Sequence, residues 1–269
     1  MTDTTFRRPI VWKSCARTDV GVVREVNEDA IFEKPEIGLW AVADGMGGHQ
    51  VGDIASSKIV TALSALTEQE SLSAYVDAVE DCLIDVNENM LEYAQIMFEE
   101  GTMGSTLVAL IIKGRIGVCL WVGDSRLYRF RNQHLVQISR DHSQLEEMIE
   151  LGLISREDTE NHPQRNVITR AVGVEMPLYV DINVFTTQVG DTFLLCSDGL
   201  YTAVSEDDIY QAMLVRDVEQ SVDMLVNQAI ANGAPDNISV IVVQGNPGKI
   251  PSAMTLKDRM KVMWLNQDE

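Results

Sequence analysis

Apolar residues along the chain fall into two kinds of pattern. Short unbroken apolar runs, bounded by glycine or polar residues, indicate buried strands. Elsewhere apolar positions recur at helical spacing, most clearly over residues 71–97, where they mark one face of a long helix. We predict strands at residues 14–23, 30–32, 39–43, 107–112, 116–122, 127–130, 179–185, 192–196 and 238–244. We predict helices from about residue 51 to 66 and over residues 71–97, 205–215 and 217–231.

Three segments lie outside this regular pattern. Residues 139–175 contain only short helical pieces and form the longest stretch without a strand signal, so we interpret them as a flap over a site. Residues 1–13 are expected to be a loosely packed lead, and residues 247–269 a tail after the last strand. The remaining residues, 14–246, are enough for one domain with a large core.

The charge balance limits the classes of partner. The 269 residues include 21 Lys and Arg against 41 Asp and Glu, which gives a net charge of −20. Binding to phosphate backbones depends on Lys and Arg, so nucleic acid and anionic membrane surfaces are disfavoured partners. Acidic residues are so common here that a single Asp carries little information about function.

Cysteine usage and hydropathy indicate the cytoplasm as the default location. No two of the four cysteines form a CxxC pair, and all lie in or beside apolar runs, so we expect inert core thiols rather than zinc or redox chemistry. No stretch approaches the ~20 apolar residues of a membrane span. The cysteines are Cys15, Cys82, Cys119 and Cys196.

The chain is organised around the strand at residues 39–43. This apolar run leads directly into Asp44, which is followed by Gly45 and, after two more glycines, by His49. Glycine permits positive φ angles and close approach to the main chain. A rigidly held Asp44 carboxylate beside the Gly45 carbonyl is an oxygen-rich arrangement that suits a hard cation.

Other aspartates occur in the same context. Asp124 and Asp198 each follow an apolar strand and stand next to glycine, whereas Asp236 directly precedes the last strand. If these strands are neighbours in antiparallel sheets, their carboxylates meet at one edge, where cations must neutralise the mutual repulsion. Oxygen ligation favours Mg²⁺ or Mn²⁺ over zinc. The competing interpretation of any one aspartate is an ordinary turn or cap residue.

Eight separated motifs resemble the bacterial branch of the metal-dependent protein phosphatases, the protein phosphatase 2C-like family, in the order expected for it. The resemblance covers residues 14–244. At the metal-binding positions the sequence matches the family pattern throughout. It implies an α+β fold, a four-layer α/β/β/α sandwich of two antiparallel sheets flanked by helices, with a flap subdomain. The motifs are Arg24…Asn27-Glu28-Asp29, residues 43–49, Gly104-Ser105-Thr106, Gly123-Asp124-Ser125-Arg126, Asp141-His142-Ser143, residues 165–173, residues 197–200 and Asp236-Asn237.

The resemblance also implies a role for each residue of the site. Asp44 bridges two metal ions, and the Gly45 carbonyl binds one of them. Asp198 and Asp236 hold the other, and Asp124 joins Asp198 in a possible third site.

The same resemblance assigns the chemistry. Glu28 acts through metal-bound water, Asp29 orients the attacking water, and Arg24 binds the substrate phosphate. His49 is the expected general acid, a role that suits histidine because its ordinary pKa is near neutral. The alternative readings are a surface ion pair for Arg24 and a turn residue for His49. We interpret His134 as solvated, and His142 and His162 as structural or flap residues.

The implied activity is hydrolysis of phosphoserine and phosphothreonine in proteins. The expected cofactors are two Mn²⁺ or Mg²⁺ ions, plus a possible third, which activate a water and neutralise phosphate oxygens. The expected partners are phosphorylated proteins and a cognate bacterial Ser/Thr kinase that the enzyme opposes, with the enzyme itself a monomer.

Two alternatives to this function stay open. The first is a metal-binding signalling module that docks a phosphoprotein without turnover. The second keeps the chemistry but narrows the substrate to regulators of a sigma-factor switch. That subgroup usually carries added sensor domains, for which the sequence leaves no room.

The tail after Pro251 lies outside the resemblance. Its apolar residues alternate with basic residues, which predicts a short amphipathic helix. Such a helix either docks a partner or the acidic surface of the protein itself, or packs on the domain, or frays.

Overall fold

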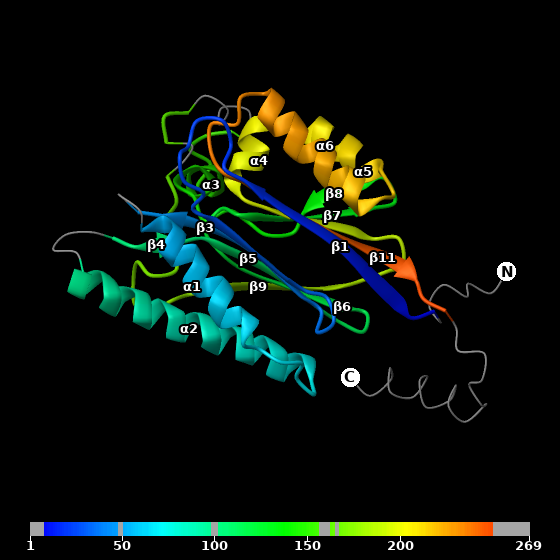
Figure 1. Cartoon of the computed structure of the whole chain (residues 1–269), viewed down its shortest axis with the longest axis horizontal. Helices are drawn as coiled ribbons and strands as arrows, with labels where there is room; N and C mark the ends of the chain where they lie inside the picture. Colours follow the sequence, from blue (N-terminus) through cyan, green and yellow to red (C-terminus); the bar gives the residue numbers. More distant parts are fainter. Residues whose placement is uncertain (1–7, 48–50, 98–101, 156–161, 165–166, 250–269) are drawn as a thin grey trace.

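A computed structural model of the protein describes residues 8–47, 51–97, 102–155, 162–164 and 167–249. Eleven strands and six helices lie in these ranges. The strands form two sheets that pack face to face, with helices on both outer faces (Figure 1). The expected four-layer arrangement of two antiparallel sheets between helices is therefore confirmed.

The first sheet has five strands, all paired antiparallel. Their apolar residues alternate between a face that meets helices and a face that meets the other sheet. In spatial order the strands are β1 (Ile10–Asp19), β11 (Ile238–Pro247), β10 (Thr192–Cys196), β7 (Arg126–Arg131) and β8 (His134–Gln137).

The second sheet is also antiparallel throughout. Its central strands are buried on both faces, which explains why they appear in the sequence as unbroken apolar runs. Its strands in order are β2 (Asp29–Lys34), β3 (Leu39–Met46), β5 (Leu107–Lys113), β6 (Ile116–Val122) and β9 (Asp181–Thr186), and the short β4 (Gly104–Ser105) pairs with β3.

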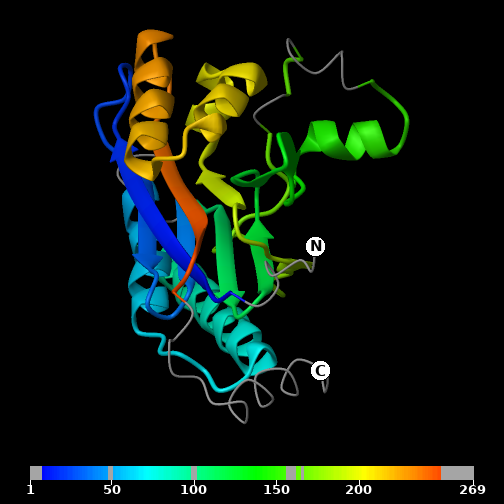
Figure 2. The same cartoon turned by 90° about the vertical axis from the view of Figure 1, so that its right-hand side faces the viewer.

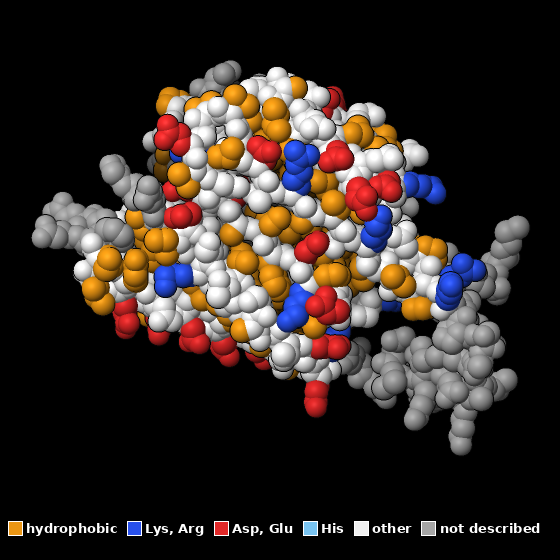
Figure 3. Space-filling model, viewed as in Figure 1, with side chains coloured by type: hydrophobic (Ala, Val, Ile, Leu, Met, Phe, Trp, Pro, Cys, Tyr) orange, Lys and Arg blue, Asp and Glu red, His pale blue; other side chains and the backbone are white. Residues whose placement is uncertain are grey.

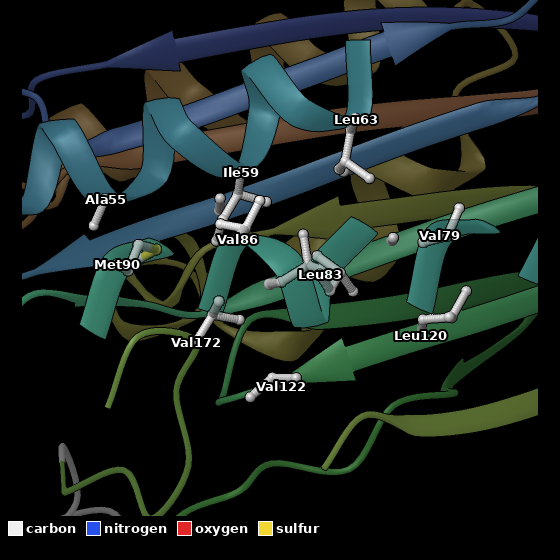
Figure 4. Close-up of a cluster of buried hydrophobic side chains, with 14 of the residues drawn as sticks. Ala55, Ile59, Leu63, Val79, Leu83, Val86, Met90, Leu120, Val122 and Val172 are labelled. Carbon is white, nitrogen blue, oxygen red and sulfur yellow. The ribbon is translucent and has the colours of Figure 1, made fainter. Parts of the chain in front are cut away.

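Helices cover each sheet on its outer side and enclose separate cores. Helices α1 (Gly52–Ser64) and α2 (Leu72–Met97) lie on the second sheet, and Figure 4 shows the buried cluster that includes Ile59 of α1, Leu83 of α2 and Leu120 of β6. Helices α4 (Asp198–Ala203), α5 (Glu206–Leu214) and α6 (Val218–Ala231) lie on the first. A third core, which includes Trp40 and Phe193, fills the space between the sheets.

The exposed side of α2 concentrates negative charge. Its carboxylates recur at helical spacing on the side away from the core, and acidic side chains line the edge of the molecule where α2 runs (Figure 3). In the described part of the chain, no helix is long and apolar enough to cross a membrane. The exposed acidic residues of α2 are Asp77, Asp81, Asp85, Glu88 and Glu92.

Several element boundaries differ from those we predicted. Strand β1 begins at Ile10, inside the expected lead, because residues 10–13 pair in register with the end of β11. Strand β8 and helix α4 were not predicted. Strand β8 has only 4 residues, and α4 has only 6, so neither produces a recognisable period.

The expected flap is partly described. Helix α3 (Gln144–Glu150) begins after Ser143, whose hydroxyl accepts a hydrogen bond from the Glu146 N–H, and it stands out from the sheets in Figure 2. The cap expected at Ser155 and Asp158 involves residues outside the described ranges, as does the tail from residue 250 onward. The four cysteines are free; Cys119 and Cys196 are buried, whereas Cys15 and Cys82 are partly exposed.

Candidate active site

Strands β2 and β3 bring the first two carboxylates together. Asp29 begins β2 and lies directly opposite Asp44 in the ladder, and the charge of Asp29 adds to burial in raising the pKa of Asp44. Asp29 is only 8% exposed, and the Ser197 hydroxyl donates to its Oδ2 at 2.7 Å. Because Ser197 follows β10, this bond joins the two sheets at the end where the site forms.

Helix α4 and the start of β11 add two more aspartates. Asp198 is the first residue of α4, and its charge also contributes to the raised pKa of Asp44. Asp236 lies two residues before β11. These two segments are in close contact, because a Cβ on Gly199 would overlap the main-chain carbonyl of Asn237. Glycine is therefore required here for Asp198 and Asp236 to approach each other.

Asp124 occupies the turn between β6 and β7 and is 7% exposed. The Tyr201 hydroxyl of α4 donates to its main-chain carbonyl at 3.1 Å, which holds the turn against that helix. Behind the turn, the Arg126 guanidinium binds both oxygens of Asp141 and lies 3.6 Å from the centre of the Tyr201 ring.

The site carries more negative charge than its own residues can compensate. Burial, and then the charges of Asp29, Asp198, Asp124 and Asp236, raise the pKa of Asp44 well above its usual value. Burial also raises the pKa of Asp29 and of Asp198 to about 6, in each case with a further contribution from the charge of Asp236. Burial and the charge of Asp198 raise the pKa of Asp124 to about 7.

Arg24 and Glu28 approach the site from the segment before β2. The Arg24 Nη2 donates to Asp236 Oδ2 at 2.7 Å, and this hydrogen bond raises the pKa of the guanidinium. Burial raises the pKa of Glu28. A Cβ added to Gly52 would stand 2.6 Å from Glu28 Oε1 and 2.8 Å from the Gly45 carbonyl oxygen, so these two oxygens face one small space.

Three supporting side chains were not singled out from the sequence. The Asn237 Oδ1 accepts from the Glu28 N–H, while its Nδ2 donates to the carbonyls of Val20 and Val26. Ser197 supports Asp29, as described above. Thr106 accepts from the Asp44 N–H at 3.2 Å through its Oγ1. All three residues lie within the motifs that carry the family resemblance, and this was the one signal in the sequence that could have identified them. Their hydrogen-bond partners could not be predicted, because those partners are far away in the sequence.

The structure thus brings together most residues that the sequence predicted for the site. Asp29, Asp44, Asp124, Asp198 and Asp236 interact electrostatically, and Arg24 contacts Asp236. Glu28 and Gly45 face the same space. His49 lies outside the described residues.

The donor set fits Mg²⁺ or Mn²⁺ better than zinc. Within the described residues, no group of three or more His, Cys, Asp or Glu side chains could by itself hold a metal ion. Mg²⁺ commonly takes only one or two carboxylates and completes its shell with other oxygens and water. The crowded carboxylates and the Gly45 carbonyl supply such oxygens, and divalent cations would relieve the repulsion that raises the pKa of Asp44.

Comparisons with known proteins agree with this site. The family profile "Protein phosphatase 2C" matches residues 22–236. A serine/threonine phosphatase stp from Listeria welshimeri is 39% identical over 240 residues, which cover 86% of this chain and 94% of that protein.

Solved structures share the fold. PppA, described as a key regulatory component of T6SS in Pseudomonas aeruginosa, has a TM-score of 0.82 and 43% identity, covering 88% of this chain and 99% of that one. The catalytic domain of the serine threonine protein phosphatase PstP, in complex with 2 manganese ions, has a TM-score of 0.80 and 30% identity over 88% and 99% of the two chains. The chain therefore belongs to the protein phosphatase 2C family of serine/threonine protein phosphatases.

Proposed function

We propose that this chain hydrolyses phosphoserine and phosphothreonine in phosphorylated proteins with the help of two Mn²⁺ or Mg²⁺ ions, and that it opposes a bacterial Ser/Thr kinase. The observation that carries the proposal is the convergence of four carboxylates on Asp44, whose pKa their charges raise in addition to burial: Asp29, Asp198, Asp124 and Asp236. The two manganese ions of the PstP domain support the same chemistry, because that domain has the same fold.

Each carboxylate has a proposed role as a ligand. Asp44 interacts electrostatically with both Asp29 and Asp198, so it would be the ligand shared by two ions, and the Gly45 carbonyl would bind one of them. Asp198 and Asp236 would hold the second ion. Asp124, whose pKa is raised by burial and then by the charge of Asp198, would join Asp198 at a third site. Glu28 faces the Gly45 carbonyl and acts through water.

When bound, the ions lower the pKa of a water molecule and neutralise phosphate oxygens. Asp29 accepts a hydrogen bond from Ser197, which fixes the carboxylate so that it can orient the attacking water. Arg24, 49% exposed, donates to Asp236 and has further donors for the non-bridging oxygens of a phosphate. His49 is proposed as the general acid from its position in the sequence alone.

The experiment is phosphate release from a phosphothreonine peptide by the purified full chain, measured in parallel with chelator, Mg²⁺, Mn²⁺ and Ca²⁺. We expect turnover with Mg²⁺ or Mn²⁺ and little with Ca²⁺, whose looser coordination positions water poorly. The Asp44→Asn variant should lose about 10²-fold or more, because a ligand shared by both ions is removed.

Two results would contradict the proposal. One is phosphate release in chelator that equals release with Mn²⁺. The other is Asp44→Asn activity equal to that of the unchanged protein. Tight binding of the peptide without turnover under any metal would instead favour a phosphoprotein-binding module. Circular dichroism of Asp44→Asn in the same buffers separates a loss of chemistry from a loss of fold.

A further inference from the structure

His142 holds the residue that precedes Asp124. The His142 N–H donates to the Gly123 carbonyl at 2.9 Å, and the Gly123 N–H donates to the His142 Nδ1 at 3.1 Å. Both main-chain polar groups of Gly123 are therefore bonded to one residue. The ring is 8% exposed and stacks on Trp121, with 6.1 Å between ring centres and an interplanar angle of 23°. His142 thus sets where the Asp124 turn lies.

The other side of the imidazole faces β9. Because Nδ1 accepts a hydrogen bond, the proton of the neutral ring is on Nε2. Nε2 lies 3.3 Å from Oδ2 of Asp181, the first residue of β9. The atom is buried, and the contact is not aligned as a regular hydrogen bond, so a small shift of Asp181 changes how well this proton is satisfied.

The two carboxylate oxygens of Asp181 have different partners: one lies near His142, and the other is bonded to the second half of the expected flap. Its Oδ1 accepts from Arg170 Nη1 at 3.1 Å. The side chains of Asp181 and Arg170 are 44% and 41% exposed, whereas His142 is buried. The set of contacts therefore runs from the surface of the molecule to the turn that carries Asp124.

Main-chain contacts also join His142 to residues 167–170. The Thr169 N–H donates to the His142 carbonyl at 2.8 Å, and Ser143 forms an isolated bridge with Ile168. Residues 167–170 are thus bonded to His142 through both the backbone and the Arg170–Asp181 pair. These contacts connect residues 167–170 to the Gly123–Asp124 turn through His142.

We propose that His142 is a positioning residue that couples the placement of the Asp124 carboxylate to that of residues 167–170, through Asp181. The inference rests on the proposed function in one respect only, the role of Asp124 as a ligand. Under this proposal, neither His142 nor Asp181 contacts the substrate. Outer partners of this kind orient a ligand and are commonly worth about tenfold or more in metal affinity.

The test uses the full chain with Asp181→Asn, which keeps the shape of the side chain but weakens its attraction for the Nε2 proton. Hydrogen exchange is followed at the Gly123 and Thr169 amides in chelator, and Mn²⁺ binding is followed by calorimetry. His142→Asn is the second variant, because its side-chain oxygen can replace Nδ1 but cannot extend to Asp181. Val184→Ala is the control, an exposed residue of the same strand.

We expect Asp181→Asn and His142→Asn to speed exchange at both amides and to weaken Mn²⁺ binding about tenfold, while Val184→Ala changes neither. In an Asp124→Asn background, Asp181→Asn should have no further effect on Mn²⁺ binding, because coupled residues are not additive. Faster exchange at Thr169 with unchanged exchange at Gly123 overturns the coupling. If Asp124→Asn itself binds Mn²⁺ normally, the ligand role of Asp124 fails, and the exchange measurements still decide the coupling.

Discussion

Asp29 and Asp44 face each other across the β2–β3 ladder, and after burial the charge of Asp29 is the largest cause of the raised pKa of Asp44. Burial raises the pKa of Asp29 as well. Two carboxyl groups at this position therefore resist ionisation in a site that, by our proposal, is built for divalent cations. Several consequences can be measured without a substrate.

The stability of the metal-free protein should fall as the pH rises from about 4 to about 7. Asp29 and Asp198 have folded pKa values of about 6, and Asp124 of about 7, whereas an unfolded aspartate has a pKa of about 3.9. Between these values the folded protein binds more protons than the unfolded chain. Its stability from these groups is therefore complete below about pH 4 and is lost through pH 6–7.

Urea unfolding in chelator at pH 5 and at pH 7.5 checks this dependence. The same pair of measurements with Mn²⁺ should show a much smaller fall, because cations replace the protons. Greater stability at pH 7.5 than at pH 5 in chelator would contradict the assigned charge state of the site.

Asp44→Asn should stabilise the metal-free protein at pH 7.5. Burial, and then four neighbouring carboxylates, raise the pKa of Asp44, and the neutral amide removes the cost of a buried charge at nearly constant volume. The same variant should lose the gain in melting temperature that Mn²⁺ gives the unchanged protein. Thermal melts with chelator and with Mn²⁺ measure both effects, and a variant that is less stable in chelator contradicts the prediction.

Ser197→Ala should destabilise the fold by about 1–3 kcal/mol but leave phosphate release within about tenfold. The buried hydroxyl donates to Asp29 and accepts from the Ser239 N–H at 3.0 Å, so it is engaged in structural bonds. Water, not serine, is the proposed nucleophile. Urea unfolding and intact-protein mass spectrometry test the two parts. A phosphorylated Ser197 in the unchanged protein during turnover, with an inactive alanine variant, would reverse the assignment.

Asn237→Ala should cost about 2–4 kcal/mol, because it removes three hydrogen bonds from a residue that is 4% exposed. These bonds join the segment before β2 to the start of β11, so the variant should also weaken Mn²⁺ binding. Asn246→Ala is a matched control at the other end of β11, where the side chain makes one long bond of 3.5 Å. Equal losses in the two variants would contradict a special role for Asn237.

Local patterns were enough to place most elements. Strands β6 and β10 were predicted to the residue, because strands buried on both faces are continuous apolar runs bounded by turns. The helix starts after Ser205 and Asp217 were also correct, and both side chains accept hydrogen bonds from the first turn. The start of β1 was misplaced, because pairing with β11 decides it.

The sequence by itself determined which carboxylates stand at strand ends and, through its ordered motifs, which family the chain resembles. These properties depend on neighbouring residues and on the short repeat of apolar positions, both of which can be read directly from the amino-acid sequence. Only the tertiary structure decided that Asp29 bonds to Ser197, that Arg24 pairs with Asp236, and that His142 meets Gly123, Thr169 and Asp181. Such contacts join segments far apart in the chain, and the packing of two sheets and their helices sets them, which no local pattern encodes.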